Sequence, residues 1–470
     1  MLPINFNFHR GSDYLFHVIL PIVAVCLPPL FISLNLSIMP LITITIERLF
    51  TTFGFCMWCV LLIVAYREIR ARPGISIEEG VVVLLPLLTS FFFLVLIVEY
   101  VGKSWDYENY EDAIRAVILR ENPYNNPHYL YPPFFAQSMA GIYRIGEKLF
   151  DNEGLNLWLF VFYIHQCAQF FLINLAYQLS SRFGSYIGLS DMQNKIIVTA
   201  LFLFNFPLIR TLHLNQVNLY ILDAALIALL TLNKFPYASG AAVMFGGLIK
   251  LYPFIIGVPL VLMRKWKAVF GALISGIVVV LLQTNFGRDL SLWKQFILFL
   301  ISFPVDRESS LWIRNTTLIS LARNLSHFTG MSESMIQPLF ITAMLVVLVW
   351  IAIRFYKREK IYPTLTPGIL AETYRNSGNL IDFTGLALLI TPSAWDHHFV
   401  IALPLALWAV ALRRYEMSVG RRVDGWVGVA IVCIFILPPF DIFPLSYLRM
   451  FGVIALLIFT SPDVPLKSSS

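Results

Sequence analysis

Charged residues are scarce in this sequence. Asp, Glu, Lys and Arg together make up 13% of its 470 residues, whereas a soluble domain carries about a quarter. With 58% hydrophobic residues and a mean hydropathy of +0.73, the chain has too few polar side chains to cover a water-facing surface. This shortage excludes a soluble globular protein and indicates that lipid surrounds most of the chain.

The motifs of soluble nucleotide-dependent and hydrolytic enzymes are also missing. The sequence has no Walker A loop, no Gly-x-Gly-x-x-Gly after a strand, no Gly-x-Ser-x-Gly and no His-Glu-x-x-His. An enzyme of this kind would lack a domain for a nucleotide-activated substrate. Its activated substrate would therefore have to arrive through the membrane, carried on a lipid.

Cysteine is rare as well, and its positions argue against redox chemistry. Cys26, Cys56, Cys59, Cys167 and Cys433 all lie in apolar runs. Although Cys56 and Cys59 have the spacing of a thiol pair, their surroundings favour ordinary buried cysteines. The N-terminus lacks the basic, apolar and small-residue pattern of a cleaved leader, so the first hydrophobic run is expected to be retained.

Long apolar runs are what the sequence has in abundance. Residues 80–101 contain no charged side chain before Glu99, and at 1.5 Å per residue they are long enough to cross about 30 Å of hydrocarbon. Similar runs recur along the whole chain. The sequence therefore predicts an all-α, polytopic transmembrane helical bundle of about 12–13 spans.

The net charge of +6 indicates topology rather than nucleic-acid binding. Basic clusters at residues 67–73, 264–267, 356–360 and 413–422 mark the cytoplasmic side. The span at residues 80–101 then leads outward, which places the polar segment after it on the extracytoplasmic face. That segment, WDYENYEDAIRAVILRENPYNNPHYLYPP, is the longest polar stretch in the first half of the chain.

The next helix, at residues 131–150, raises a problem of parity. If it crossed the membrane, the NQVN segment at residues 215–218 would lie in the cytoplasm, whereas Arg182, Lys195 and Lys234 favour an outer location for it. A re-entrant or interfacial helix at residues 131–150 resolves the conflict. Its closing sequence, YRIGEKLFDNEG, is charged enough for an interface.

An acidic cluster opens the first outer segment. It consists of Asp106, Glu108, Glu111 and Asp112. If the segment is helical from Tyr107, Asp106 stands at the N-cap, which is a common structural role for Asp. The alternative is that the cluster supplies a general base or a metal ligand at the membrane surface.

Aromatic residues and a lysine also lie on this face. Tyr129 and Tyr131 in NPYNNPHYLYPPF suit an aromatic belt at the headgroup level. Lys250 interrupts an apolar run in GGLIKLYPF. It either snorkels to the outer interface or supplies a point charge for a lipid-linked phosphate.

Two further polar groups lie later in the chain. In Trp395-Asp396-His397-His398 the adjacent histidines would point about 100° apart on a helix, so they do not form a zinc pair. One histidine together with Asp396 could still join a polar site with Asp106. Arg314-Asn315, in the outer loop before it, is either part of the same site or simply solvated.

Taken in order, these segments resemble the glycosyltransferase C superfamily. Within it they are similar to glycosyltransferase family 87, the polyprenyl-phosphate-mannose-dependent mannosyltransferases and their relatives. The resemblance covers about residues 105–410. It rests on D-Y-x-x-Y-x-D-A, N-P-Y, Y-L-Y-P-P-F, H-L-N-Q-V-N-L, G-L-I-K-L-Y-P-F, N-T-T-L and T-P-S-A-W-D-H-H. The family's N-Q-S-L phrase reads N-T-T-L here, so acceptor contacts do not carry over from it.

The resemblance implies a chemistry and assigns roles to residues. A polyprenyl phosphate sugar would be the donor, an extracytoplasmic glycolipid or glycan the acceptor, and the anomeric centre would be inverted without a metal or other cofactor. Asp106 would be the general base, with Asp112 as the second candidate, and His213 and Lys250 would hold the donor phosphate. The remaining substrate-binding candidates are Tyr129, Tyr131, Asn215, Gln216, Asn218, Tyr252, Arg314, Asn315, Trp395, Asp396, His397 and His398.

The implied organisation has three parts. Residues 1–79 form two additional spans, residues 80–412 the catalytic membrane domain and residues 413–470 C-terminal spans with a short tail. The protein would reside in the plasma membrane with its site facing outward, and mannose is the first expectation for the sugar. The rival classes are a lipid or solute transporter without catalytic turnover, and an assembly subunit with an inactive site.

Overall fold

The computed structural model describes residues 77–99, 102–149, 156–302, 315–365, 369–391, 393–418 and 425–462. Within these ranges all regular structure is helical and no strand occurs, which confirms the all-α fold. The chain divides into two compact units, residues 1–104 with 139–175 and residues 105–138 with 176–470. The additional N-terminal spans, the cysteines before residue 77 and Arg314 lie outside the described residues.

The described part of the first unit consists of helices with long apolar segments. Helix α4 (Ile77–Glu99) carries no charged residue between Glu79 and Glu99. Helix α6 (Pro133–Leu149) runs into this unit, and most of α7 (Leu157–Tyr186), a helix of 30 residues, belongs to it. Cys167 on α7 is buried, as expected for a cysteine in an apolar run.

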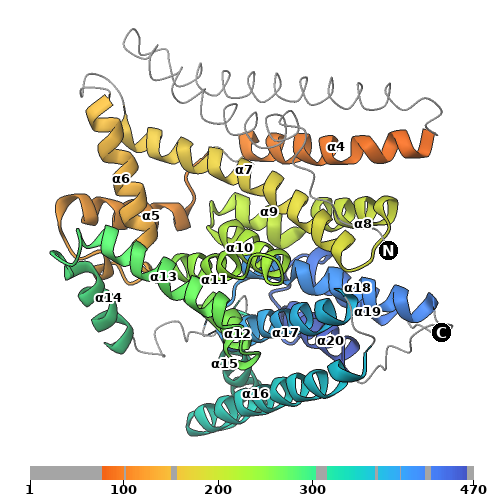
Figure 1. The fold of residues 1–470 in the computed structure, drawn as a ribbon. Helices are drawn as coiled ribbons and strands as arrows, with labels where there is room; N and C mark the ends of the chain where they lie inside the picture. Colours follow the sequence, from red (N-terminus) through yellow and green to blue (C-terminus); the bar gives the residue numbers. More distant parts are fainter. Residues whose placement is uncertain are drawn as a thin grey trace. The chain divides into compact units, whose positions relative to one another are not determined.

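The second unit contains the other described elements (Figure 1). They are α5 (Trp105–Leu119), η2 (Pro123–Asn125), α8 (Asp191–Leu203), α9 (Phe206–His213), α10 (Asn218–Thr231), α11 (Pro236–Ile249), η3 (Tyr252–Gly257), α12 (Val258–Leu262), α13 (Trp266–Gln283), α14 (Ser291–Ser302), α15 (Leu318–Thr329), η4 (Glu333–Met335), α16 (Ile336–Ile361), η5 (Tyr362–Thr364), α17 (Ile369–Ile390), η6 (Asp396–Ala402), α18 (Leu403–Ser418), α19 (Trp426–Ile431), η7 (Val432–Ile436), η8 (Leu445–Tyr447) and α20 (Leu448–Phe459).

Four helices in the described ranges are long and apolar enough to cross a membrane. They are α7, α13, α16 and the continuous stretch Asp396–Tyr415 made by η6 and α18; a fifth candidate is the pair α8 and α9, bent by 49°. Helix α6 is not among them, in agreement with an interfacial or re-entrant role. Several shorter apolar helices accompany these candidates, and the expected total of 12–13 spans stays a prediction.

Two helix breaks in the second unit carry polar residues. Helix α11 ends at Lys250, whose backbone is extended, and the chain continues as a 3-10 turn before α12. A second 3-10 turn, η6, precedes α18. Irregular backbone at membrane depth is stable only where protein or a polar cavity satisfies its hydrogen bonds. Both breaks carry the polar motifs noted in the sequence.

Glycines let α11 and α13 pack closely, and α10 lies beside them (Figure 1). A Cβ atom on Gly240 would overlap the Ala268 carbonyl, and one on Gly271 would overlap the Tyr237 carbonyl. Small residues of this kind allow two membrane helices to approach to backbone contact. The pair therefore forms a rigid support for Lys250 at the end of α11.

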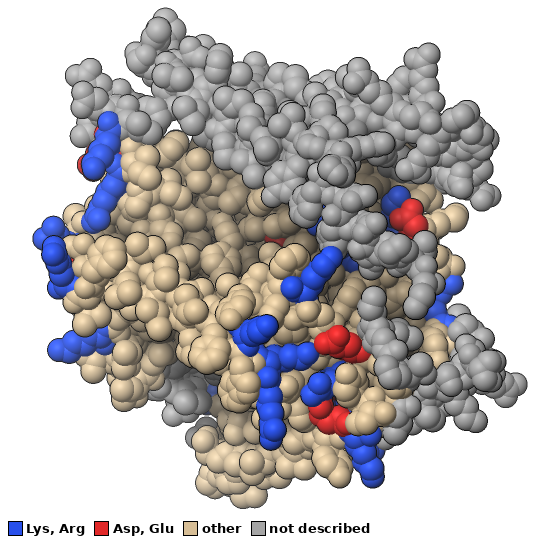
Figure 2. Space-filling model, in the orientation of Figure 1, with Lys and Arg blue, Asp and Glu red and all other residues tan. Residues whose placement is uncertain are grey.

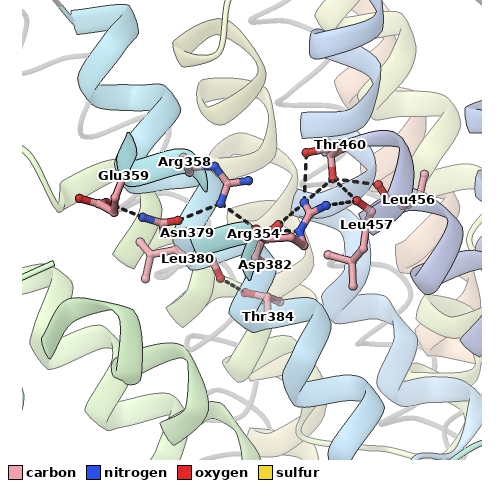
Figure 3. A network of polar contacts seen from close by, with 10 residues as sticks. All are labelled: Arg354, Arg358, Glu359, Asn379, Leu380, Asp382, Thr384, Leu456, Leu457 and Thr460. Carbon is pink, nitrogen blue, oxygen red and sulfur yellow. Dashed lines mark hydrogen bonds and ion pairs between the residues drawn. The ribbon is translucent and has the colours of Figure 1, made fainter. Parts of the chain in front are cut away.

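A buried ion network joins α16, α17 and α20 (Figure 3). Arg354 donates from Nε and Nη2 to the two carboxylate oxygens of Asp382, at 3.0 and 2.7 Å. Arg358 donates from Nη1 to Asp382 at 2.7 Å and to Asn379 at 2.8 Å. Arg354 also reaches the carbonyl oxygen of Thr460 at 3.1 Å. The three ionised side chains are at most 2% exposed.

The surface has the character expected of a membrane protein. Wide areas of the face shown in Figure 2 carry neither basic nor acidic side chains. On α13 and α16, large apolar residues such as Leu282, Ile277 and Val346 are more than half exposed. Apolar side chains in such positions would be solvated by lipid tails.

Candidate active site

Asp106 lies in the first turn of α5, among groups contributed by distant segments. The helix begins at Trp105, one residue before the predicted N-cap, so Asp106 is a helical residue and its carboxylate gains from the positive end of the helix dipole. The Asp106 side chain is half-buried and hydrogen-bonds to the side chain of Gln216. Lys250 and Arg210 add positive charge nearby.

The NQVN segment supplies the centre of the site through a tight turn. Asn215, two residues after the end of α9, has a left-handed conformation with φ of 51°, which Asn adopts more readily than other side chains. The reversal turns the buried side chains of Gln216 and Asn218 toward the end of α11, where each accepts a hydrogen bond from Lys250. Asn215 therefore shapes the site through its backbone.

Lys250 is held by three acceptors from separate parts of the chain. Its Nζ lies 3.2 Å from Gln216 Oε1, 2.9 Å from Asn218 Oδ1 and 3.1 Å from His398 Nε2. The ammonium group also sits 5.2 Å from the centre of the Tyr131 ring, a distance typical of a cation–π contact. At 6% exposure this lysine does not snorkel to the surface.

The histidine pair is fixed by the 3-10 turn η6. Because a protonated lysine only donates, Nε2 of His398 accepts from Lys250 at 3.1 Å. Nδ1 of His398 lies 3.0 Å from the backbone nitrogen of Trp395 and 3.3 Å from its carbonyl oxygen. The His397 ring stacks on His398 at 4.5 Å, and its carbonyl accepts from Thr211 and Asn218, each at 3.2 Å.

Asp396 is engaged in an ion pair with a residue from the C-terminal region. Arg449 Nη1 lies 3.2 Å from Asp396 Oδ1, and both side chains are more than nine-tenths buried. Arg449 also donates to the Leu437 carbonyl at 2.7 Å. This pair anchors the start of η6 on α20, so Asp396 holds the histidines in place.

Tyrosines from α5 and the following loop form the wall beside Asp106. The Tyr110 hydroxyl lies 2.9 Å from both Gln216 Oε1 and the Tyr131 hydroxyl, and the Tyr131 hydroxyl lies 3.3 Å from the same oxygen. Burial raises the pKa of Tyr110 and of Tyr131, so both keep their protons. Tyr129 packs on Tyr131 and donates to the Pro132 carbonyl at 3.4 Å.

The N-T-T-L segment is hydrogen-bonded to Ala394, two residues before η6 begins. Asn315 Oδ1 accepts from the backbone of Ala394 at 3.1 Å, and Thr316 donates back to the Ala394 carbonyl from its backbone at 2.9 Å. The indole of Trp395 donates to Ser393 at 3.0 Å. Asn315 thus positions the Trp-Asp-His-His turn and is buried.

Three predicted site residues do not take part in the hydrogen bonds around Lys250: two are exposed, and one is buried with a free hydroxyl. Asp112 and His213 are exposed, and Asp112 lies six residues from Asp106 on a helix, about 120° away around its axis. The hydroxyl of Tyr252 is buried without a hydrogen-bond partner, and the Tyr252 ring meets His398 edge-on at 5.8 Å. Tyr252 therefore has a donor available at the histidine end of the site.

The arrangement combines a partly desolvated carboxylate with a buried cation. Burial raises the pKa of Asp106 above its ordinary value, while the hydrogen bond from Gln216 and the charges of Lys250 and Arg210 pull it back. A carboxylate in this setting is a stronger base than a solvated one. In the ranges that the structure describes, no cluster of three or more His, Cys, Asp or Glu side chains is placed to hold a metal ion.

Three residues that the structure places at the site were not predicted from the sequence: Tyr110, Arg210 and Arg449. In the sequence, Tyr110 is one of many aromatic residues near the expected headgroup region, and nothing distinguishes it from the others. Arg449 lies in the segment at residues 413–470, which was assigned to C-terminal spans outside the catalytic domain. A basic residue inside the apolar stretch that begins at Tyr447 is the signal that could have identified Arg449, because a charge there requires a partner.

Comparison with known proteins identifies the chain at the level of a family. A family model described as glycosyltransferase family 87 matches residues 129–371, just over half of the chain. The matched region includes the NQVN segment and Lys250, begins after Asp106 and ends before Trp395. No curated protein sequence and no solved structure matches the chain.

Proposed function

The chain belongs to glycosyltransferase family 87, and we propose that it transfers a hexose from a polyprenyl phosphate sugar to an extracytoplasmic acceptor, with Asp106 as the general base. That it is a membrane glycosyltransferase follows from the family and from its apolar helices. The observation that supports the finer proposal is the placement of one half-buried carboxylate beside one buried lysine, joined through Gln216.

The proposed reaction is a single inverting displacement. Asp106 takes the proton of an acceptor hydroxyl, and the acceptor oxygen attacks the anomeric carbon on the face opposite the phosphate. The bond from that carbon to the phosphate oxygen breaks, and its electron pair goes to the phosphate. The products are an inverted glycoside and a polyprenyl phosphate that carries one more negative charge than the donor phosphate carried.

The cationic half of the site suits that increase in charge. Lys250 is held by neutral groups, the amides of Gln216 and Asn218 and the ring of His398, so its charge is available to an incoming phosphate. A fixed cation in a partly desolvated site stabilises negative charge that develops in the transition state. The Tyr252 hydroxyl, which is buried without a partner, is a second donor for the phosphate.

The outward orientation and the plasma membrane are part of the same proposal. The proposal of an outward site is supported by the basic clusters of residues 264–267 and 356–360, which are expected on the cytoplasmic side. Mannose is the first candidate for the sugar. A transporter would need a polar path through both membrane leaflets, and family membership supports the enzyme.

The proposal is tested with purified protein in lipid vesicles and a panel of polyprenyl phosphate sugars, including mannose, glucose and arabinose donors. We expect one of them to yield a glycosylated lipid or glycan, identified by mass and with an inverted anomeric linkage, together with free polyprenyl phosphate. Transfer from a nucleotide sugar alone would contradict the proposal, and so would movement of the donor across the bilayer without formation of a glycosidic bond.

The pH dependence of transfer should report the buried base. Only the ionised form of Asp106 accepts a proton, so kcat/KM rises with pH and levels off above the pKa of this group. Because burial raises that pKa, the midpoint of the rise is expected above the ordinary value of about 4. Lys250→Met removes a charge that lowers the pKa, so its midpoint should lie higher still; a midpoint below 4 or unmoved by Lys250→Met would contradict the assignment.

A further inference from the structure

The amide of Gln216 has only one possible orientation in this site. Lys250 Nζ, at 3.2 Å, can only donate, so the amide atom that faces it is the oxygen. Asp106, which also hydrogen-bonds to this side chain, can only accept when ionised, so it faces the amide nitrogen. The cation and the base thus contact opposite ends of one neutral side chain.

The tyrosines reinforce this orientation. The hydroxyls of Tyr110 and Tyr131 lie 2.9 and 3.3 Å from the same oxygen of Gln216, and burial keeps both protonated. The oxygen therefore faces three donor groups from α5, the following loop and the end of α11. From its motif in the sequence, Gln216 was expected to bind substrate. Because its oxygen is occupied by protein donors and its nitrogen is directed at Asp106, Gln216 is poorly placed to hydrogen-bond to a sugar.

We propose that Gln216 is a positioning residue: its neutral amide keeps Lys250 and Asp106 from pairing directly and holds each in the place that its role requires. This inference rests on the proposed function of the site and assigns no contact with substrate to Gln216. A direct ion pair would stabilise the charged carboxylate and weaken it as a base. It would also neutralise the cation that the donor phosphate needs.

Replacing Gln216 by Glu tests the role of the neutral amide with almost no change in shape. Lys250 and the two tyrosines would hold the new carboxylate ionised, so its second oxygen faces Asp106 with a like charge. Two carboxylates in contact raise the pKa of one of them strongly. We expect the rise of kcat/KM with pH to move upward by about one pH unit or more. Because the new carboxylate also pairs with Lys250, kcat above the new midpoint should stay below that of the unmodified protein, by about as much as in Asn218→Asp.

Asn218→Asp is the matched control. It places the same charge beside Lys250, whose Nζ lies 2.9 Å from Asn218 Oδ1, but Asn218 does not bond to Asp106. The midpoint should move by less than half of the Gln216→Glu shift. If Gln216→Glu does not fold, Gln216→Met is expected to lower kcat by more than about tenfold.

Two results would overturn the inference. A folded Gln216→Glu protein with an unmoved pH midpoint would reduce Gln216 to a packing role, and a rise of donor or acceptor KM at constant kcat would make it a substrate ligand. The pKa of Asp106 can also be followed without turnover, from the pH dependence of the melting temperature of each variant with and without Asp106→Asn. That measurement distinguishes failure of this inference from failure of the proposed reaction, because it requires no donor.

Discussion

Asp106→Asn is expected to lower the rate of sugar transfer by about 10³-fold while the protein stays folded. A positioned general base contributes about 10²- to 10⁴-fold, and Asn has the shape of Asp but cannot accept the proton. The loss should appear in kcat, with donor KM little changed, because the carboxylate acts on the acceptor hydroxyl. The measurement is steady-state transfer in vesicles from the donor that the panel identifies.

The same substitution should not weaken the fold. Burial raises the pKa of Asp106, so the folded protein binds this proton more tightly than the unfolded chain does. Linkage then makes ionisation of Asp106 a cost to the folded state, which begins above the pKa of the unfolded chain and is complete above the raised pKa. At neutral pH the Asn variant should therefore melt no lower than the unmodified protein.

Glu108→Gln is the control for a carboxylate on the same helix. Glu108 is exposed two residues after Asp106, and its neutral variant should retain activity within about twofold, as surface changes do. Asp112→Asn separates the two acidic candidates. If Asp112→Asn abolished transfer while Asp106→Asn kept it, the base would be Asp112 and the pairing of Asp106 with Gln216 would serve structure alone.

The parts of this fold that follow from the sequence are those that depend on local pattern. The uncharged run at α4 was predicted from hydropathy, because a membrane span is a continuous apolar segment that needs no distant partner. The interruption at Lys250 was recognisable for the same reason. A charged residue in an apolar run is conspicuous without any knowledge of what lies beside it.

The parts that the sequence could not supply depend on contacts between distant segments. Gln216 meets Tyr110 across 106 positions, and Lys250 meets His398 across 148; no periodicity reports such pairs. The turn at Asn215 depends on a positive φ that Asn permits without requiring it. Residues of the motifs were thus identified, whereas their partners, and the exposure of His213, required the structure.

Asp382→Ala is expected to cause the largest loss of stability among single changes in the second unit. It would leave the guanidinium groups of Arg354 and Arg358 buried without their shared carboxylate. Removing one partner of a buried ion pair costs about 3–5 kcal/mol, and here two cations lose one anion. The melting temperature in detergent, followed by tryptophan fluorescence, should fall far more than in any surface variant.

Glu359→Gln provides the matched comparison on the same pair of helices. Glu359 and Arg375 are paired at 2.8 Å but remain about a quarter and a fifth exposed, so the change should cost no more than about 1 kcal/mol.

Replacing all three buried partners, as in Arg354→Met, Arg358→Met with Asp382→Leu, should recover much of the loss, because no unpaired charge remains. If Asp382→Ala melted like Glu359→Gln, water would reach the two arginines, and the network would not lock α16, α17 and α20 together.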